Sequence, residues 1–205
     1  SKAKILLASS SEIYGDPLIH PQTENFKGYS STTSKRGCYV EGKRISETLF
    51  SEFQNMHNVD IRIVRLFNTY GPRMLKNDGR VVCNFISQAL NNEKITIYGT
   101  GSQTRSLCYI SDITRGLIMV MDNNYKKPIN LGSPNELSII NLANIIKNKI
   151  NPNLEFENLL LPEDDPKKRR PDIELVKKLL KWEPIVNIDK GLDLTIDYFK
   201  KDKLN

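Results

Sequence analysis

The stretch KILLASSSE, residues 4–12, joins an apolar run of strand length to a row of polar side chains. An apolar run without polar alternation predicts a strand that is buried on both faces, as in a parallel sheet. A second strand is predicted over residues 59–66, with a long helix between the two over residues 38–57. Strands that alternate with helices in this way indicate an α/β fold, with helices on the faces of the sheet.

The helix predicted over residues 38–57 carries two patterns of side chains. Ile45, Leu49 and Phe53 recur every four residues, which predicts a stripe that faces the core. Tyr39 and Lys43 lie one turn apart on a neighbouring face. An ammonium beside a phenol favours the phenolate, which can take a proton from an alcohol while hydride leaves the alcohol carbon. The alternative is an ordinary pair on a surface helix.

The second half of the chain continues the alternation more loosely. Its order fits a Rossmann-type part followed by a smaller mixed α/β lobe, with segments exchanged between the two. Extended segments are expected over 95–98 and 105–110, with a tight turn at 99–102 between them. Helices are expected over 80–92, from a cap at Ser111 or Asp112 to about residue 121, and from a cap at Ser138 to residue 150. After a polar loop at 162–171 we expect a short helix and then a terminal amphipathic helix that ends near residue 201.

Composition excludes several classes of protein. Three scattered cysteines and two histidines make a disulfide framework or a metal site improbable, and we expect reduced, buried thiols. A formal charge of +6 does not by itself identify a binding partner. The sequence has no basic stripe interleaved with aromatic residues of the kind that binds nucleic acid, so we expect no nucleic-acid partner. No apolar run reaches the ~18 residues of a membrane span, so we expect no membrane contact from this chain. The sequence opens on Ser1 directly before an apolar run, so we expect a fragment or a processed form.

The eleven glycines are nowhere spaced as GxGxxG. The glycine-rich turn that places backbone N–H groups against a dinucleotide pyrophosphate is therefore missing from the predicted first strand and helix. Gly99 and Gly101 form a lone GxG, which a hairpin explains better than a phosphate-binding loop.

Polar residues at the predicted strand ends are candidates for chemistry. Ser10, Ser11 and Glu12 follow the first strand, where hydroxyls can bind a substrate oxygen and a carboxyl group can act as acid or base. Asn68 follows the second strand and can hold a sugar or phosphate oxygen. A polar turn with a serine cap and a turn-capping asparagine are the simpler interpretations.

Arginines near predicted element starts are candidate anion binders. The forked guanidinium groups of Arg80 and Arg105 suit a phosphate, although surface arginines are more often merely solvated. The run KKRR at residues 167–170 has acidic neighbours that cancel most of its field, which argues against nucleic acid. It is a solvated loop or an anion-binding arginine held between Pro166 and Pro171.

Six motifs in one order resemble the extended short-chain dehydrogenase/reductase family of the NAD-dependent epimerase/dehydratase type. They are SSSEIYGDP (9–17), YVEGK (39–43), RLFNTYGPR (65–73), YGTGSQTRSLCYISD (98–112), NLGSP (130–134) and KKRRPDI (167–173) followed by Trp182-Glu183-Pro184. Within the family the similarity is to the UDP-glucuronate decarboxylases, which use NAD to oxidise C4 of the sugar, release carbon dioxide and form UDP-xylose. Ser11 stands where the related 4,6-dehydratases carry aspartate, and an arginine before proline supplies a counter-charge to a carboxylate.

The resemblance implies a role for each candidate residue. Tyr39 would be the base on the 4-hydroxyl, with Lys43 on the nicotinamide ribose. Ser10 would bind near the 4-oxygen, and Ser11 and Glu12 would flank C5 and the carboxylate. The resemblance places Ala8, Ser10, Tyr39, Lys43 and Thr69 at NAD, and Asn68, Arg80, Tyr98 and Arg105 at the UDP moiety, with Arg169 facing the sugar carboxylate.

The resemblance also implies the wider organisation. Residues 1–75 would be the C-terminal part of an NAD-binding domain that exchanges segments near 105–132, and residues 76–205 would mainly form the nucleotide-sugar-binding lobe. Family members carry a glycine-rich loop and further β/α units before this point, so activity would require that N-terminal segment. The alternatives to a decarboxylase are a 4,6-dehydratase or 4-epimerase of the same family, or a truncated, non-catalytic remnant that binds UDP-sugars. The family pattern further implies a homodimer in the cytoplasm, or in the Golgi lumen if a membrane anchor precedes the chain.

Overall fold

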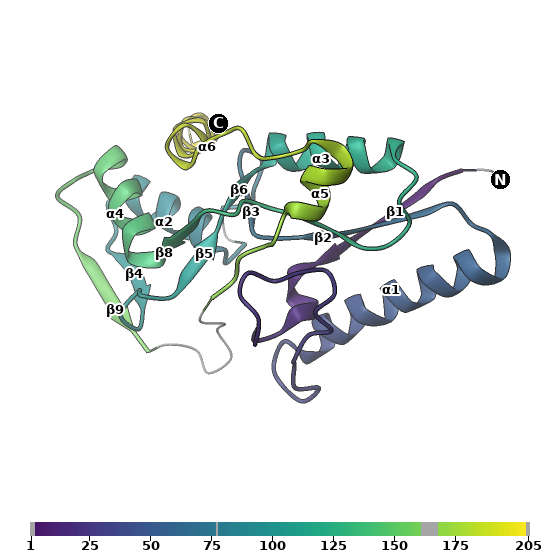
Figure 1. Ribbon diagram of the computed structural model, residues 1–205. Helices are drawn as coiled ribbons and strands as arrows, with labels where there is room; N and C mark the ends of the chain where they lie inside the picture. Colours follow the sequence, from purple (N-terminus) through teal and green to yellow (C-terminus); the bar gives the residue numbers. More distant parts are fainter. Residues whose placement is uncertain (1–2, 77, 161–167, 204–205) are drawn as a thin grey trace.

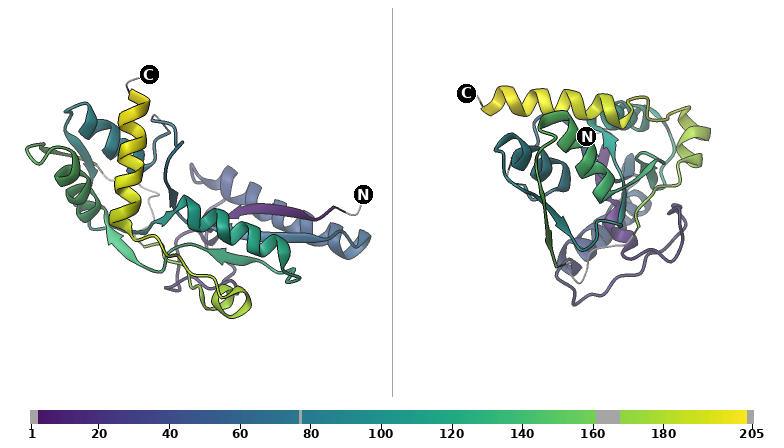
Figure 2. Two further views of the ribbon diagram at one scale, coloured as in Figure 1. Left: turned by 90° about the horizontal axis from the view of Figure 1, so that it is seen from above. Right: turned by 90° about the vertical axis from the view of Figure 1, so that its left-hand side faces the viewer.

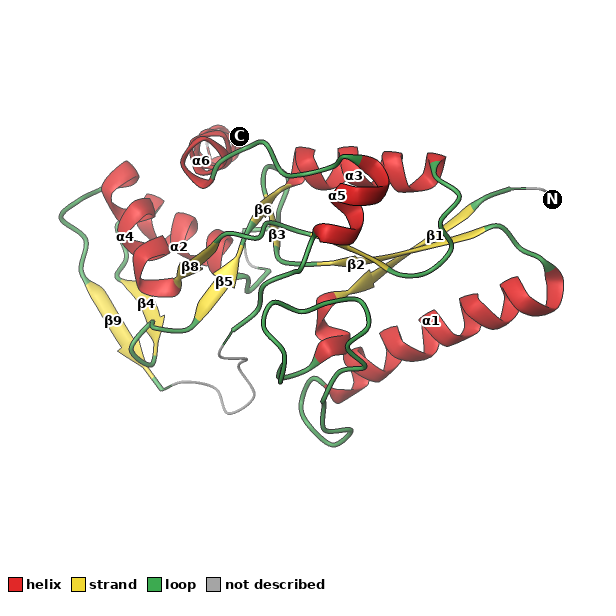
Figure 3. Cartoon of the chain, in the orientation of Figure 1, coloured by secondary structure: helices red, strands yellow, loops and turns green. Residues whose placement is uncertain are grey.

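The computed structural model describes residues 3–76, 78–160 and 168–203 (Figures 1 and 3). In chain order its elements are β1 (Ile5–Ser10), the 3-10 helix η1 (Ser11–Tyr14), α1 (Gly37–His57), β2 (Ile61–Leu66), β3 (Thr69–Tyr70), α2 (Val81–Leu90), β4 (Ile95–Tyr98), β5 (Thr104–Ser106), β6 (Cys108–Tyr109), α3 (Ile110–Asp122), β7 (Ile129–Leu131), β8 (Glu136–Ser138), α4 (Ile139–Ile150), β9 (Phe156–Leu159), α5 (Glu174–Leu180) and α6 (Ile188–Lys203).

A parallel sheet in the order β1-β2-β7 forms the first lobe. Helix α1 covers one face of this sheet and α3 covers the other (Figure 1). Beneath α3 the core contains Val64, Ile129 and the fully buried Trp182. Burial of these large apolar side chains, at about 25 cal/mol per Å², holds the helices on the sheet. The predicted α/β class is confirmed.

Two details of the first lobe differ from the sequence prediction. Strand β1 is not buried on both faces: Ile5 is 44% exposed, because among the described residues β1 pairs only with β2 and its other edge is open. The stripe of Ile45, Leu49 and Phe53 does not face the core either, and each of its side chains is at least 50% exposed. Helix α1 instead turns Val40 and the polar Glu47 toward the sheet.

The second lobe is a mixed α/β structure built from short two-stranded sheets. Strands β4 and β9 pair in parallel and β5 and β8 pair antiparallel. Helices α2, α4 and α6 pack against one another beside these strands, and Figure 2 shows α6 lying across the lobe. Their shared core includes Phe85, Ile86, Ile97, Leu142 and Phe199.

The two lobes meet at the short parallel pair of β3 and β6, in which Tyr70 is opposite Tyr109. Helix α6 approaches this pair closely, since a Cβ on Gly191 would lie 2.0 Å from the Tyr70 hydroxyl oxygen. A residue larger than glycine would therefore push α6 off the junction. The expected division near residue 75 stays a prediction, although α5 and Trp182 pack onto the sheet of the first lobe.

The predicted N-terminal cap is confirmed for α4 but not for α3. Ser138 caps α4 as predicted, because its side chain accepts from the Asn141 backbone N–H. Helix α3 begins at Ile110 rather than at a Ser111 or Asp112 cap, and the buried Asp112 carboxylate accepts from the backbone of Ile185 and Val186 instead.

The lone GxG and one of the three thiols also differ from expectation. The turn through Gly99 and Gly101 is not a hairpin, since it joins β4 to β5, which pair with different strands. Cys83 and Cys108 are buried as expected, whereas Cys38 is exposed near the start of α1. Among the described residues no cluster of histidine, cysteine or acidic side chains could hold a metal. None of the helices in the described ranges is both long and apolar enough to cross a membrane.

Candidate active site

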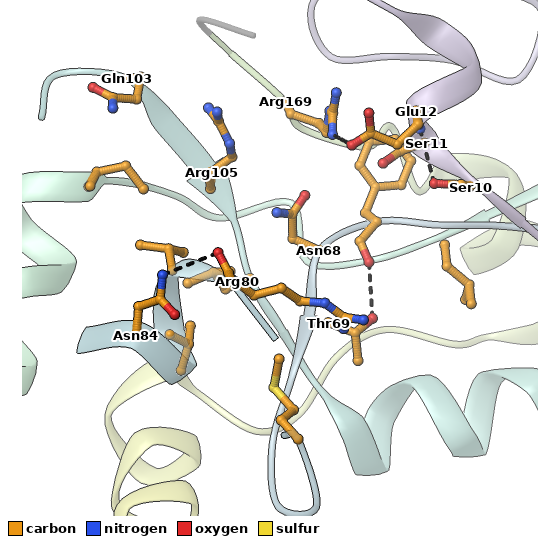
Figure 4. A pocket seen from close by; sticks show the side chains of 18 of the residues that line it. Ser10, Ser11, Glu12, Asn68, Thr69, Arg80, Asn84, Gln103, Arg105 and Arg169 are labelled. Carbon is orange, nitrogen blue, oxygen red and sulfur yellow. Dashed lines mark hydrogen bonds and ion pairs between the residues drawn. The ribbon is translucent and has the colours of Figure 1, made fainter. Parts of the chain in front are cut away.

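A cavity of about 980 Å³ lies between the lobes, at the carboxyl ends of β1 and β2. Figure 4 shows Ser10, Ser11 and Glu12 on one side of it, with Arg169 against Glu12 and Asn68 toward Arg105 and Gln103. The carboxyl end of a parallel sheet is where open α/β folds place ligands. The structure brings every predicted site residue to this cavity: Ala8, Ser10, Ser11, Glu12, Tyr39, Lys43, Asn68, Thr69, Arg80, Tyr98, Arg105 and Arg169.

Tyr39 and Lys43 stand on the first turns of α1, beside the end of β1. The Lys43 ammonium lies 5.8 Å from the centre of the Tyr39 ring and donates a hydrogen bond of 2.8 Å to the carbonyl of Ala8. Tyr39 is 52% exposed and lines the cavity, so its hydroxyl is accessible to a ligand. An ammonium has three donors, so Lys43 keeps further N–H groups for a ligand hydroxyl.

The serines that follow β1 have different surroundings. Ser9 is committed to the fold, because its hydroxyl donates to Glu47 at 2.5 Å and Glu47 also pairs with Arg65. Ser10 caps η1, since its Oγ accepts from the backbone N–H of Glu12 at 3.2 Å, and it lines the cavity as well. The simpler cap interpretation and the ligand interpretation therefore both apply to Ser10.

Glu12 is held between two arginines. Its carboxylate pairs with Arg169, whose side chain is 6% exposed, and with Arg36 at 3.1 Å. Burial alone would raise the pKa of Glu12, but the charges and hydrogen bonds of Arg169 and Arg36 outweigh burial and hold this pKa below its usual value. Glu12 is therefore a carboxylate at neutral pH, which can accept hydrogen bonds but is a poor general acid.

The far side of the cavity carries groups that suit a diphosphate. Arg105 is 7% exposed and one of its nitrogens donates to the Thr104 carbonyl at 2.8 Å. Arg80 pairs with Asp78 at 3.2 Å. The Asn68 side-chain amide makes no hydrogen bond to any other described residue. The two guanidinium groups and the Asn68 amide present hydrogen-bond donors that suit an anion, and Asp78 offsets part of the charge of Arg80.

The residues expected at NAD fit one part of that cofactor. Ser10, Tyr39, Lys43 and Thr69 line the cavity and present hydroxyl and ammonium groups, which suit a ribose. Within the described ranges β1 leads into a serine-rich turn rather than a glycine-rich one, so these residues offer no pyrophosphate loop.

Sequence reasoning missed Arg36 and Gln22. Arg36 directly precedes α1, where the positive end of the helix dipole disfavours a cation. A positive charge at this unfavourable position is the feature of the sequence that could have identified it. Gln22 is 1% exposed, and its backbone and side chain bond the backbone of Arg170, the residue after Arg169. No local pattern marks Gln22, because its partners lie far along the chain.

Known proteins share both the sequence and the fold. The family described as the NAD dependent epimerase/dehydratase family matches residues 1–132. The chain is 48% identical over 200 residues to UDP-glucuronic acid decarboxylase 1 of Xenopus tropicalis, covering 98% of this chain and 48% of that protein. It is 50% identical over 198 residues to UDP-glucuronic acid decarboxylase 3 of Arabidopsis thaliana, covering 97% and 58% respectively. The chain thus spans about half the length of these relatives.

Solved structures carry the same fold. UDP-glucose 4-epimerase from Thermotoga maritima, determined with UDP-glucose, has a TM-score of 0.91 at 25% identity, covering 98% of this chain and 64% of that one. UDP-glucuronic acid 4-epimerase from Bacillus cereus, in complex with UDP-glucuronic acid and NAD, has a TM-score of 0.87 at 26% identity, covering 97% and 62%. The resemblance inferred from the six motifs is confirmed at the level of the family. The chain belongs to the NAD dependent epimerase/dehydratase family.

Proposed function

We propose that this chain is the catalytic and sugar-nucleotide-binding part of an enzyme that uses NAD to convert UDP-glucuronate into UDP-xylose and carbon dioxide through a 4-keto intermediate. The observation that carries the proposal is the buried Arg169, which lies beside Glu12 in the same cavity as the Tyr39–Lys43 pair. Relatives named UDP-glucuronic acid decarboxylase support this choice of reaction.

Tyr39 is the group that handles the proton of the 4-hydroxyl. A bound NAD would supply the hydride acceptor for C4 and the hydride donor for the final reduction. The Tyr39 phenolate takes the hydroxyl proton at the first step and gives it back to the same oxygen at the last. Lys43 places a positive charge beside the phenol ring, and its contact with the Ala8 carbonyl fixes its position. Ser10 donates a hydrogen bond near the 4-oxygen.

Loss of carbon dioxide needs a carboxylate and a place for its electrons. A 4-ketone makes the C6 carboxylate part of a β-keto acid, so breaking the C5–C6 bond leaves an electron pair that delocalises onto the 4-oxygen as an enolate. Hydrogen bonds from Ser10 and from the protonated Tyr39 stabilise that oxyanion. Arg169 holds the C6 carboxylate. After carbon dioxide has left, a proton from solvent is added at C5, which restores the 4-ketone before it is reduced.

The ionised state of Glu12 separates this reaction from a sibling activity. A 4,6-dehydratase must protonate a departing hydroxyl, which needs an acid that is protonated near neutral pH. The two arginines that lower the pKa of Glu12 make it unsuited to that step. A 4-epimerase is the second candidate, favoured by the fold likeness to two 4-epimerases.

Product analysis tests the proposal directly. The intact protein, incubated with NAD and UDP-glucuronate, is expected to release carbon dioxide and form UDP-xylose, and to give no pentose from UDP-glucose. UDP-galacturonate as the only product would favour the epimerase. Calorimetry of the 205-residue chain with NAD then tests the non-catalytic alternative, which tight binding would contradict.

Replacing the proposed proton-transfer group tests its role. Tyr39→Phe removes only the hydroxyl, and we expect kcat/KM for UDP-glucuronate to fall by about 10²–10⁴-fold, the usual contribution of a general acid or base. Tyr29→Phe is the matched control, because Tyr29 is 66% exposed and does not line the cavity. Equal kinetics for the two variants would exclude Tyr39 as the base. The homodimer and the cellular compartment stay predictions.

A further inference from the structure

The carboxylate of Glu12 is shared by two guanidinium groups from different parts of the chain. One nitrogen of Arg36 lies 3.2 and 3.1 Å from its two oxygens, and Arg169 contacts one of the same oxygens. The three side chains are unequally covered: Arg169 is 6% exposed, Glu12 19% and Arg36 51%. Arg36 therefore covers Glu12 from the solvent side, and Arg169 contacts it from within.

The balance of charges around the cavity determines how an anionic ligand would interact with these three side chains. Among the described lining residues Glu12 is the only acid, beside Arg36, Lys43, Arg80, Arg105 and Arg169. Glu12 and Arg169 by themselves form a neutral pair, so Glu12 would offset the attraction that Arg169 exerts on a ligand carboxylate beside it. With Arg36 the cluster carries two positive charges and one negative charge, and the surplus is available to an anion.

The position of Arg36 is costly for the helix that follows it. Arg36 is the residue before Gly37 at the start of α1, has no capping hydrogen bond, and places a cation at the positive end of the helix dipole. Its contact with Glu12 offsets that cost. The contact also ties the start of the helix that bears Tyr39 to η1, directly after β1.

We propose that Arg36 is a positioning residue that makes the site select a sugar carboxylate: it neutralises Glu12, so that the charge of Arg169 is free to bind the C6 carboxylate of a uronic acid. This inference rests on the proposed function, and it names the determinant of substrate class within that site. Arg36 lines the cavity, and the role assigned to it here is exerted through its ion pair with Glu12. The lowered pKa of Glu12 is consistent with this, since two cations stabilise its charge.

Binding of two ligands that differ only at C6 tests the proposal. Calorimetry on the intact protein measures Kd for UDP-glucuronate and for UDP-glucose, whose C6 carries a neutral hydroxyl group. The wild-type protein is expected to bind UDP-glucuronate more tightly than UDP-glucose. Arg36→Gln is expected to weaken UDP-glucuronate binding about three- to tenfold, a modest change because solvent screens a half-exposed charge. Its UDP-glucose affinity is expected to stay within about twofold.

Two further variants separate the role of Arg36 from general effects of charge and folding. Lys35→Gln removes one positive charge from the neighbouring exposed residue, which does not line the cavity, and should leave the preference unchanged. Arg36→Lys keeps the charge with a smaller donor group and should restore most of the preference. A merely structural role of Arg36 would weaken both ligands alike and would show in the melting temperature.

The outcomes are distinct from those for the proposed function. A wild type without preference for the carboxylate, or an Arg36→Gln variant that matches Lys35→Gln, would overturn the role of Arg36 even if carbon dioxide were released. Conversely, a preference that Arg36→Gln abolishes and Arg36→Lys restores would support this role even if the product proved to be an epimer rather than UDP-xylose.

Discussion

At the scale of single residues, the site depends on one carboxylate whose ionisation is fixed by its neighbours. Glu12 is partly buried, and burial without partners would favour its neutral form. Arg169 and Arg36 reverse that tendency. The same three side chains link η1, the start of α1 and the segment before α5, so we expect a change at Glu12 to affect stability as well as ligand binding.

Replacing Glu12 by glutamine should therefore give a stability loss that depends on pH. Because the folded-state pKa of Glu12 is lowered, its ionisation stabilises the fold above the ordinary pKa near 4.5, and this contribution is lost as pH falls through the folded-state pKa. We expect Glu12→Gln to lower the free energy of unfolding by about 2 kcal/mol at neutral pH, since it leaves the buried Arg169 without its counter-charge. The difference from wild type should shrink in acid.

Urea unfolding at a series of pH values measures that difference. Glu157→Gln is the matched control, because Glu157 is exposed on β9 and its substitution should stay within about 0.5 kcal/mol at every pH. A Glu12→Gln penalty that is constant from neutral to acid pH would contradict the assigned ionisation.

Part of this site can be predicted from the sequence residue by residue. Tyr39 and Lys43 follow from helical spacing, and Glu12 follows from its place after a strand, because both features are local. Arg36 was missed because its partner lies 24 residues earlier in the chain. Periodicity carries no information on contacts between elements.

At the scale of elements, the loop between η1 and α1 fixes the segment that presents Arg169. The backbone N–H of Gln22 in this loop donates to the Arg170 carbonyl at 2.8 Å, and the Gln22 carbonyl accepts from the Asp172 N–H at 2.8 Å. Its side-chain oxygen also accepts from the Arg170 N–H at 2.8 Å. A buried glutamine thus completes the hydrogen bonds of an irregular segment, which keeps Arg169 directed at Glu12.

Replacing Gln22 by leucine should loosen that segment. The change removes the side-chain oxygen that accepts from the Arg170 backbone N–H and the side-chain amide that donates to the Ile19 carbonyl. We expect the free energy of unfolding to fall by about 2 kcal/mol, the usual cost of buried polar groups without partners. Urea unfolding of the intact protein measures the change.

Gln54→Leu provides the comparison for this prediction. The side-chain oxygen of Gln54 is buried without a hydrogen-bond partner among the described residues, so the same substitution there should cost little. Equal losses in the two variants would mean that the hydrogen bonds of Gln22 do not hold the Arg169 segment.

Element prediction succeeded where the pattern was local and failed where it depended on a neighbour. Ser138 was identified as the cap of α4 from its position before an apolar run. The exposed stripe of Ile45, Leu49 and Phe53 shows that helical period identifies an apolar face but not what covers it. The open edge of β1 has the same cause, since an apolar strand cannot report how many strands pair with it.

At the scale of the whole molecule, the two lobes contribute different groups to one cavity. The first lobe brings Tyr39, Lys43 and Ser10, and the second brings Arg80 and Arg105. We expect substitutions in the first lobe to change the chemical step and those in the second to change substrate binding. The alternation of elements predicted the α/β class, but the meeting of the lobes depends on long-range contacts such as Gly191 against Tyr70, which no motif specifies.

Arg105→Met tests this division of labour. Loss of a buried guanidinium at the expected diphosphate position should raise KM for UDP-glucuronate about tenfold or more, with little change in kcat, because the contact is the same in the ground and transition states. Steady-state kinetics separate the two constants. Lys200→Met, at an exposed position of α6 outside the cavity, should leave both unchanged. A fall in kcat alone for Arg105→Met would contradict the assignment.

Trp182, fully buried beneath α3, is the single tryptophan of the chain. Its indole N–H donates to the Asp112 carbonyl at 3.0 Å, and the residue does not line the cavity. Its fluorescence should therefore be insensitive to ligands and should shift to longer wavelength only when the first lobe opens to water. The chain thus contains an intrinsic optical probe that distinguishes melting of one lobe from events at the site.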